Sequence, residues 1–509
     1  MNMKQIERWG MYEWTGAGRT DGNPFVDCDI RGLFHTPYGD REVAGFYDGD
    51  GRYCVRFMPE FEGEYTCQIR GSFSDQTYGD SFVCTPARPG NHGPVRVRGE
   101  HFEYSDGTPY LPFGTTCYVW ELQDEATQAQ TLEELGKGCF NKIRYCVFPK
   151  HYLYNLNEPA SYPYEGTPCR IDPKDEDSAF RAGAFEGNSW DFTRFNPEHF
   201  HRVERSIMQL QALGIEADLI MMHPYDRWGF SEMPGEADDL YWRYALARFS
   251  AFRNVWWSLA NEYDLLKKKT IADWERFAGI ILENDPYAHP RSIHNCITPY
   301  DQSRPWITHL SLQRTDLYKS SEYVDEYRAR FRKPVVMDEI CYEGNIDQGW
   351  GAISGQELVR RFWEAAMRGG YASHGETFEN PEGVLWWSHG GRLHGGSPER
   401  IRFLREILSR TPGGYLRRWE GGAWDEVAAT SESSDQQGRY VICYYGFNRP
   451  SSRLFRMPQD KRYKVEIIDT WNMTIQNAGV CSGTFRISLP GREYMAIRLT
   501  ETDDGAFGL

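Results

Sequence analysis

The feature that most constrains the fold is an alternation of strand-like and helix-like segments between residues 96 and 412. Apolar runs such as Asn141–Phe148 and Val255–Ala260 lack the period-two pattern of half-exposed strands, which is typical of parallel strands buried on both faces. Helical segments follow such runs, and one of them begins at Asn196-Pro197-Glu198 and ends at Gly214. Eight strand and helix units over about 310 residues predict an α/β fold, a (β/α)8 TIM barrel with insertions.

The segments on both sides of the predicted barrel are all-β. Arg52–Phe57 and Glu62–Ile69 alternate between apolar and polar residues, and Pro86–Gly93 is a Pro- and Gly-rich linker. Tyr440–Gly446 is one of the strands expected after the barrel. We therefore predict an N-terminal Ig-like β-sandwich over residues 1–95, a catalytic barrel over 96–412 and a C-terminal β-sandwich over 413–509.

Composition narrows the range of partners. A formal net charge of -16 argues against an electrostatic grip on nucleic acid or on an anionic membrane. The 17 Trp and 31 Tyr exceed what a core requires and suit stacking against sugar rings. No apolar run resembles a signal peptide or a membrane span, so we expect a cytoplasmic protein. The expected partner is an oligosaccharide or glycoside, with homo-oligomerisation left open.

Two carboxylates stand at strand ends and are the candidate catalytic residues. The run Val255–Ala260 ends in Asn261-Glu262, and Pro334–Met337 ends in Asp338-Glu339. Carboxyl ends of barrel strands carry the chemistry of this fold, so Glu262 and Glu339 are expected to face one opening. Two carboxylates are the minimum equipment for cleaving a glycosidic bond. The alternative is a structural role, in which Glu262 caps the next helix, or in which Asp338 or Glu343 replaces Glu339; Asp338 should point to the opposite side of its strand.

At Trp257–Glu262 and Pro334–Glu339 the chain resembles the clan A glycoside hydrolases. More closely, it is similar to a bacterial group of cellulase-like or glycosidase barrels that carry an N-terminal sandwich of unassigned function and a C-terminal β-domain. Phe57–Tyr65 carries the likeness to that sandwich. The resemblance implies that Glu262 is the proton donor and Glu339 the nucleophile.

The same resemblance implies a set of substrate-binding residues. Asn261 would hydrogen-bond the sugar 2-hydroxyl, and Arg144 would support the nucleophile by its charge. The remaining residues at matching positions are His223, His309, Trp386, Trp387 and His374. Each of these residues could instead have a structural role. Arg144 could form an ion pair, the histidines could hydrogen-bond to backbone groups, and the tryptophans could pack in the core. His374 also competes with the tryptophans for the end of strand eight.

The predicted function is that of a retaining glycoside hydrolase. The long aromatic segment from Lys150 to Phe195 is expected to wall a pocket, which favours exo action on oligosaccharides. No His-Glu-x-x-His or comparable spacing occurs, so we expect no metal and no cofactor. The rival functions are an inactive carbohydrate-binding or scaffold protein and a transglycosidase.

Overall fold

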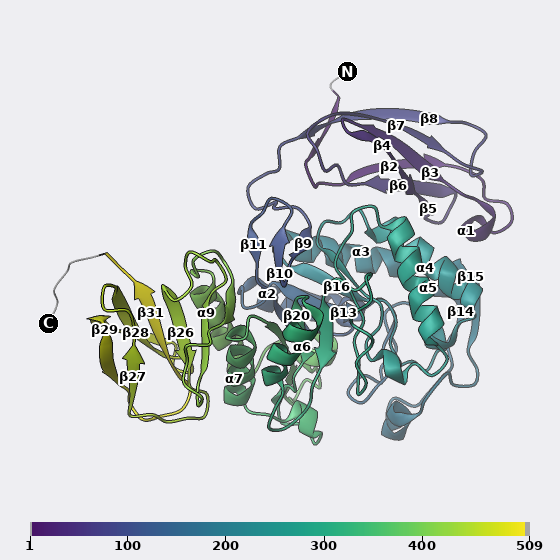
Figure 1. The fold of residues 1–509 in the computed structure, drawn as a ribbon. Coiled ribbons are helices and arrows are strands. Elements are labelled where there is room, and N and C mark those ends of the chain that lie inside the picture. Colours follow the sequence, from purple (N-terminus) through teal and green to yellow (C-terminus); the bar gives the residue numbers. More distant parts are fainter. Residues whose placement is uncertain (1–2, 504–509) are drawn as a thin grey trace.

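The computed structural model describes residues 3–503, in which a closed parallel barrel lies between two all-β domains (Figure 1). All the strand pairs of the barrel are parallel, in the order β18-β17-β16-β13-β12-β22-β20-β19, and a bridge between His294 and Ser311 joins the two outermost strands. In chain order the strands are β12 (Phe113–Thr116), β13 (Lys142–Cys146), β16 (Glu216–Ile220), β17 (Val255–Ser258), β18 (Arg291–Ser292), β19 (Leu310–Gln313), β20 (Val335–Glu339) and β22 (Tyr371–His374). The predicted TIM barrel is confirmed.

Helices cover the outside of this barrel. They are α2 (Glu125–Gly136), α3 (Pro197–Ala212), α4 (Gly235–Phe249), α5 (Ile271–Asn284), α6 (Val324–Phe331), α7 (Gly355–Ala366) and α9 (Ser397–Leu408), with the short α8 (Trp386–His389) in the loop after β22. The Asn196 side chain caps α3 and Pro197 occupies its first turn, as the sequence predicts.

One of the eight expected helices is missing. The segment between β18 and β19 contains no helix in the described chain and is made of turns and extended residues. Pro299 and Pro305 lie in this segment, and each lacks the backbone N–H that a helix interior requires. The fifth crossover is therefore a loop.

The barrel interior is polar near the carboxyl ends of the strands and apolar at the opposite end. A small antiparallel sheet, formed by β9 (Val95–Arg98), β10 (His101–Tyr104) and β11 (Pro109–Tyr110), contributes Phe102 to the apolar end. There Phe102 packs on Trp256, with Val336 and Tyr371 in the same cluster. The apolar cluster closes one end of the barrel, so the opening is at the carboxyl ends.

The N-terminal domain consists of two sheets that enclose an aromatic core around Phe34, Tyr53 and Phe82. One sheet has the order β1-β8-β7-β3-β4 and the other β2-β6-β5. The elements are β1 (Lys4–Glu7), β2 (Tyr12–Ala17), α1 (Pro24–Asp27), β3 (Arg31–Thr36), β4 (Gly39–Ala44), β5 (Phe46–Tyr47), β6 (Arg52–Phe57), β7 (Gly63–Arg70) and β8 (Tyr78–Thr85).

Buried charges join this domain to the barrel. Arg56 of β6 lies 2.6 Å from Glu204 of α3, and Arg248 of α4 lies 2.7 Å from Asp48. Arg248 also lies 2.7 Å from Glu204, so the ion pairs form one network across the interface. All four side chains are at most 9% exposed.

The C-terminal domain contains a six-stranded sheet, of order β24-β25-β26-β31-β28-β29, and a two-stranded sheet. Its strands are β24 (Leu416–Arg418), β25 (Val427–Ser431), β26 (Tyr440–Tyr444), β27 (Ser452–Arg456), β28 (Arg462–Asp469), β29 (Thr474–Ser482), β30 (Thr484–Ser488) and β31 (Met495–Glu501). Among the described residues, no helix has both the length and the apolar character needed to cross a bilayer.

Candidate active site

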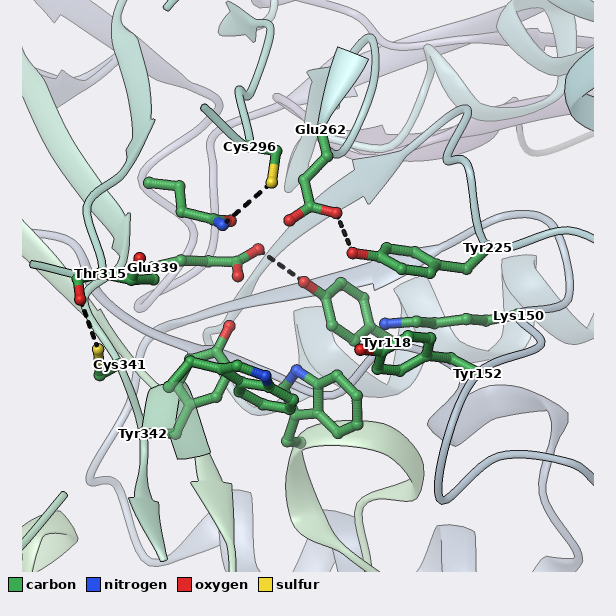
Figure 2. Close-up of a pocket in the computed structure, with 13 residues that line it drawn as sticks. Tyr118, Lys150, Tyr152, Tyr225, Glu262, Cys296, Thr315, Glu339, Cys341 and Tyr342 are labelled. Carbon is green, nitrogen blue, oxygen red and sulfur yellow. Dashed lines mark hydrogen bonds between the residues drawn. The ribbon is translucent and has the colours of Figure 1, made fainter. Parts of the chain in front are cut away.

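Glu262 lies four residues beyond β17, in a conformation that few residues other than glycine adopt. Its backbone has φ 51° and ψ 54°, in the left-handed region. For a side chain of this size such a conformation costs free energy, and strained residues of this kind cluster at functional sites. The carboxylate accepts a hydrogen bond from the hydroxyl of Tyr225, which follows β16 (Figure 2).

Glu339 is the last residue of β20, and its side chain turns into the barrel. Along β20, Val336 and Asp338 face the interior and Met337 packs in the outer core, so alternation would turn Glu339 outward. The register with β19 shifts at this strand end, where Gln313 pairs with Glu339. The hydroxyl of Tyr118 donates a 2.6 Å hydrogen bond to Oε1 of Glu339, which lies in the opening.

Asp338 lies one layer below Glu339. It was expected on the opposite side of the strand, but its carboxylate points into the barrel, where it accepts hydrogen bonds from Ser311 and Ser373. Lys142 lies 3.0 Å from Asp338 and 2.6 Å from Asp218, and all three side chains are buried. Asp338 is therefore part of a buried charge layer rather than a rival for Glu339.

Arg144 connects this charge layer to the site. Its Nη1 lies 3.5 Å from Oε1 of Glu339, and its Nη2 donates to Oδ1 of Asn261 at 3.2 Å. His294, which follows β18, brings Nε2 to within 3.2 Å of the same Glu339 oxygen. Three side chains, those of Tyr118, Arg144 and His294, thus converge on one carboxylate.

The surroundings of the two glutamates differ in their effect on ionisation. Burial raises the pKa of Glu262, and the charge of Glu339 raises it further. Burial would also raise the pKa of Glu339, but His294, Arg144 and Tyr118 outweigh it and lower that pKa below its ordinary value. The surroundings therefore favour the neutral form of Glu262 and the ionised form of Glu339.

The two glutamates line one pocket of about 290 Å³ and face each other across it (Figure 2). Its other lining residues are mainly aromatic and polar: Tyr118, Lys150, Tyr152, Tyr225, Cys296, Gln313, Thr315, Cys341, Tyr342, Trp350 and Trp387. Aromatic faces with a few polar groups are typical of sugar-binding pockets. Lys150 and Tyr152 confirm that the segment after β13 contributes to the wall.

Lys150 is a positively charged residue of this pocket that forms no ion pair within residues 3–503. Its ammonium lies 3.5 Å from the ring centre of Tyr118 and 4.3 Å from that of Trp387, and no carboxylate pairs with it. Burial lowers the pKa of Lys150 to about 8. Cation–π contacts hold the charge while leaving its N–H donors available to a ligand.

The predicted substrate-binding residues divide into two groups. Trp387 lines the pocket, whereas Arg144 lies 3.5 Å from Glu339, donates to Asn261 and does not itself line the pocket. Trp386 is directed into the core, where its indole N–H donates to Thr115. His223 is buried beside the pocket and bonds to the Phe148 carbonyl rather than lining the pocket.

Two of the predicted histidines lie elsewhere. His309 comes before β19 rather than at its end, and it packs on Phe102 and Trp256 at the closed end of the barrel. His374 points outward from β22, where Phe140 packs on its ring. Both predictions of a pocket position are wrong because strand boundaries and side-chain alternation, which set the direction of each ring, were misassigned.

Sequence reasoning missed several site residues, among them Tyr118, Tyr225 and His294. Each of them closely follows a barrel strand: β12, β16 and β18 respectively. The rule that selected the two glutamates therefore had a signal for these residues as well. Lys150 lies four residues beyond β13, so the same signal extends to it.

A closed parallel barrel with two facing strand-end carboxylates defines the class, a glycosidase of the clan A type. The family model described as "Apiosidase-like, catalytic domain" matches residues 97–427. The chain belongs to this Apiosidase-like family. Domains of unknown function match on either side, DUF5060 over residues 5–71 and DUF5605 over residues 424–500.

Solved structures agree with this assignment. A protein from Bacteroides vulgatus ATCC 8482 named "putative glycoside hydrolase" is 36% identical, with a TM-score of 0.88, over 98% of this chain and 100% of that chain. A glycoside hydrolase family 5 protein from the same organism is 14% identical, with a TM-score of 0.61, over 81% of this chain and 95% of the other, and shows the shared fold alone. No curated protein sequence matches the chain.

Proposed function

We propose that the protein is a retaining exo-glycosidase that removes a terminal sugar from an oligosaccharide. The observation that carries the proposal is the opposite electrostatic setting of two facing carboxylates, Glu262 with a raised pKa and Glu339 with a lowered pKa. A neutral carboxylic acid beside an ionised carboxylate is the pair that double displacement needs.

In the proposed reaction Glu339 attacks the anomeric carbon while Glu262 protonates the departing oxygen. The bond to the leaving group breaks, and a covalent glycosyl-enzyme forms. Glu262, now ionised, then takes a proton from water, which attacks the same carbon and releases Glu339. Arg144 and His294 would stabilise the charge of Glu339 when it is the leaving group.

The shape of the site supports cleavage at a chain end. The pocket of about 290 Å³ suits a small glycone, and a larger hollow of about 500 Å³ adjoins it across Tyr152 and Tyr225. This hollow also contains Leu265 and Leu266, which follow Glu262, so it lies on the side of the proposed proton donor. The leaving saccharide would occupy the hollow, with a ring against the exposed Phe180.

The decisive experiment is a screen of nitrophenyl glycosides, furanosides included. The family description makes nitrophenyl apiosides the first substrates to test. For a cleaved substrate, proton NMR of the first product should show the anomeric configuration of the substrate. An inverted product would contradict the double-displacement mechanism. Added sugar acceptors then distinguish hydrolysis from glycosyl transfer.

A further inference from the structure

Three buried side chains outside the pocket form a group with metal-ligating chemistry. Glu343, His374 and Glu376 are 5%, 0% and 1% exposed. Each brings one potential ligand atom to within 4.8 Å of the other two, and this is the one grouping of that kind in residues 3–503. It lies behind the strand ends, so the glycosidase site does not account for it.

The topology brings these residues together. His374 ends β22, and Glu376 begins β23 (Glu376–Thr377) two residues later, so both side chains fall on one face of an extended segment. The short strand β21 (Glu343–Gly344) pairs in parallel with β23, and Glu343 lies opposite Glu376 in the register. The two carboxylates and the imidazole therefore meet between the ends of strands seven and eight.

Hydrogen bonds hold all three side chains from the outside. The backbone N–H groups of His394 and Gly395 donate to Glu376, and those of Gly396 and Ser397 donate to Glu343. Nδ1 of His374 contacts the Thr115 hydroxyl at 3.0 Å. Support of this kind, with amides on the carboxylates and a partner on the second ring nitrogen, is what metal-ligating side chains usually have.

One polar atom of the group has no hydrogen-bond partner. Nε2 of His374 is buried and has no hydrogen-bond partner, and no hydrogen bond joins it to either carboxylate. One ring nitrogen of His374 lies within 4.8 Å of an oxygen of each carboxylate, and no hydrogen bond joins the ring to either of them. A cation bound by all three residues would lie about 2.0–2.2 Å from each ligand atom.

We propose that Glu343, His374 and Glu376 bind one divalent first-row transition cation, with zinc and manganese as the leading candidates. An imidazole nitrogen favours zinc over magnesium or calcium, while carboxylate oxygens suit both zinc and manganese. Two ionised carboxylates buried side by side would be stabilised by a nearby positive charge, and over residues 3–503 neither Glu343 nor Glu376 forms an ion pair with Lys or Arg.

The cation would act as a structural tie. Glu343 closely follows the pocket residues Cys341 and Tyr342, while Glu376 precedes the loop that carries Trp387. With the two neighbouring carboxylates in these positions, only glycine fits at position 395. A Cβ there would lie 2.4 Å from Glu343 Oε2 and 2.7 Å from Glu376 Oε2, which is too close. Binding would therefore fix the floor of the pocket from behind without contacting the substrate.

The test is metal analysis of tag-free protein expressed in medium supplemented with zinc and manganese. We expect about one equivalent of one of these metals per chain after dialysis. Chelation with EDTA should lower the melting temperature by at least about 3 °C, and the same metal should restore it. Glu376→Gln should lose the bound metal, while Glu382→Gln, an exposed residue in the following loop, should retain it.

Less than about a tenth of an equivalent in the wild-type protein, together with an unchanged melting temperature in EDTA, would overturn the proposal. If Glu376→Gln fails to fold, calorimetric titration of the EDTA-treated wild-type protein with zinc or manganese chloride decides instead, and absence of binding counts against it. These outcomes are independent of glycosidase activity, because Glu262 and Glu339 take no part in them.

Discussion

The hydroxyl of Tyr118, which follows β12, donates a 2.6 Å hydrogen bond to Oε1 of Glu339 at the end of β20, and β22 alone separates these two strands. A donor at that oxygen stabilises the ionised form of the carboxylate and thereby helps to lower its pKa. The bond links the carboxyl ends of the first and seventh strands, which flank the eighth strand in the barrel.

Tyr118→Phe should move the acidic limb of the pH profile of kcat/KM to higher pH. Loss of the donor raises the pKa of Glu339, which must be ionised to attack, so activity disappears at a higher pH than in the wild type. We expect kcat/KM to fall by about tenfold to a hundredfold, the worth of a hydrogen bond to a charged group. Tyr463→Phe, in the C-terminal domain, is the control, and an unmoved limb would argue against a role for Tyr118.

Substitution of the two glutamates should give different kinetic signatures. Glu339→Gln removes the proposed nucleophile and should lower kcat by roughly 10⁴-fold or more with every substrate. Glu262→Gln removes the acid, so its effect should be small with dinitrophenyl leaving groups and large with poor ones. The exposed Glu379→Gln is the control. Equal losses across leaving groups in Glu262→Gln would refute its assignment as the acid.

Two buried lysines should respond oppositely to replacement by methionine. Lys142 pairs with Asp218 and Asp338, so Lys142→Met leaves buried carboxylates unpaired and should cost about 3–5 kcal/mol in the free energy of unfolding. Lys150 has no carboxylate partner, so Lys150→Met should change stability little and raise KM. Denaturant unfolding and steady-state kinetics measure both effects.

Lys150→Met should also shift the alkaline limb of kcat/KM. The ammonium group lowers the pKa of Glu262, so its removal raises that pKa. Glu262 must be protonated to act as the acid, and the limb should therefore move to higher pH. A shift to lower pH would show that another group sets this limb.

The adjacent tryptophans provide a matched pair. Trp386→Ala should destabilise the protein by about 3–5 kcal/mol because it leaves a cavity in the core. Trp387→Ala removes a pocket wall and should mainly raise KM. Thermal unfolding and substrate titration distinguish the two variants, and similar effects from both would contradict the assigned directions.

The parts of the fold and site that sequence predicted are those governed by local pattern. Apolar runs that end in Asn261-Glu262 and Asp338-Glu339 identify strand ends in a barrel. Glu262 and Glu339 line the same pocket. The pattern could not give the direction of His374, because a strand error of one residue reverses the face. Nor could the pattern give the contacts of Lys150, because they depend on four aromatic rings from separate segments.

The ion-pair network that includes Asp48, Arg56, Glu204 and Arg248 has a consequence for protein engineering. A shortened protein starting at the barrel would retain Glu204 and Arg248 but lose two of their counterions, Arg56 and Asp48. Glu204 and Arg248, which are buried at the interface, would then be exposed to solvent without these two counterions. The N-terminal sandwich therefore behaves as a structural part of the barrel rather than as a detachable accessory, and exchanging it between relatives would require both halves of the network to be transferred together.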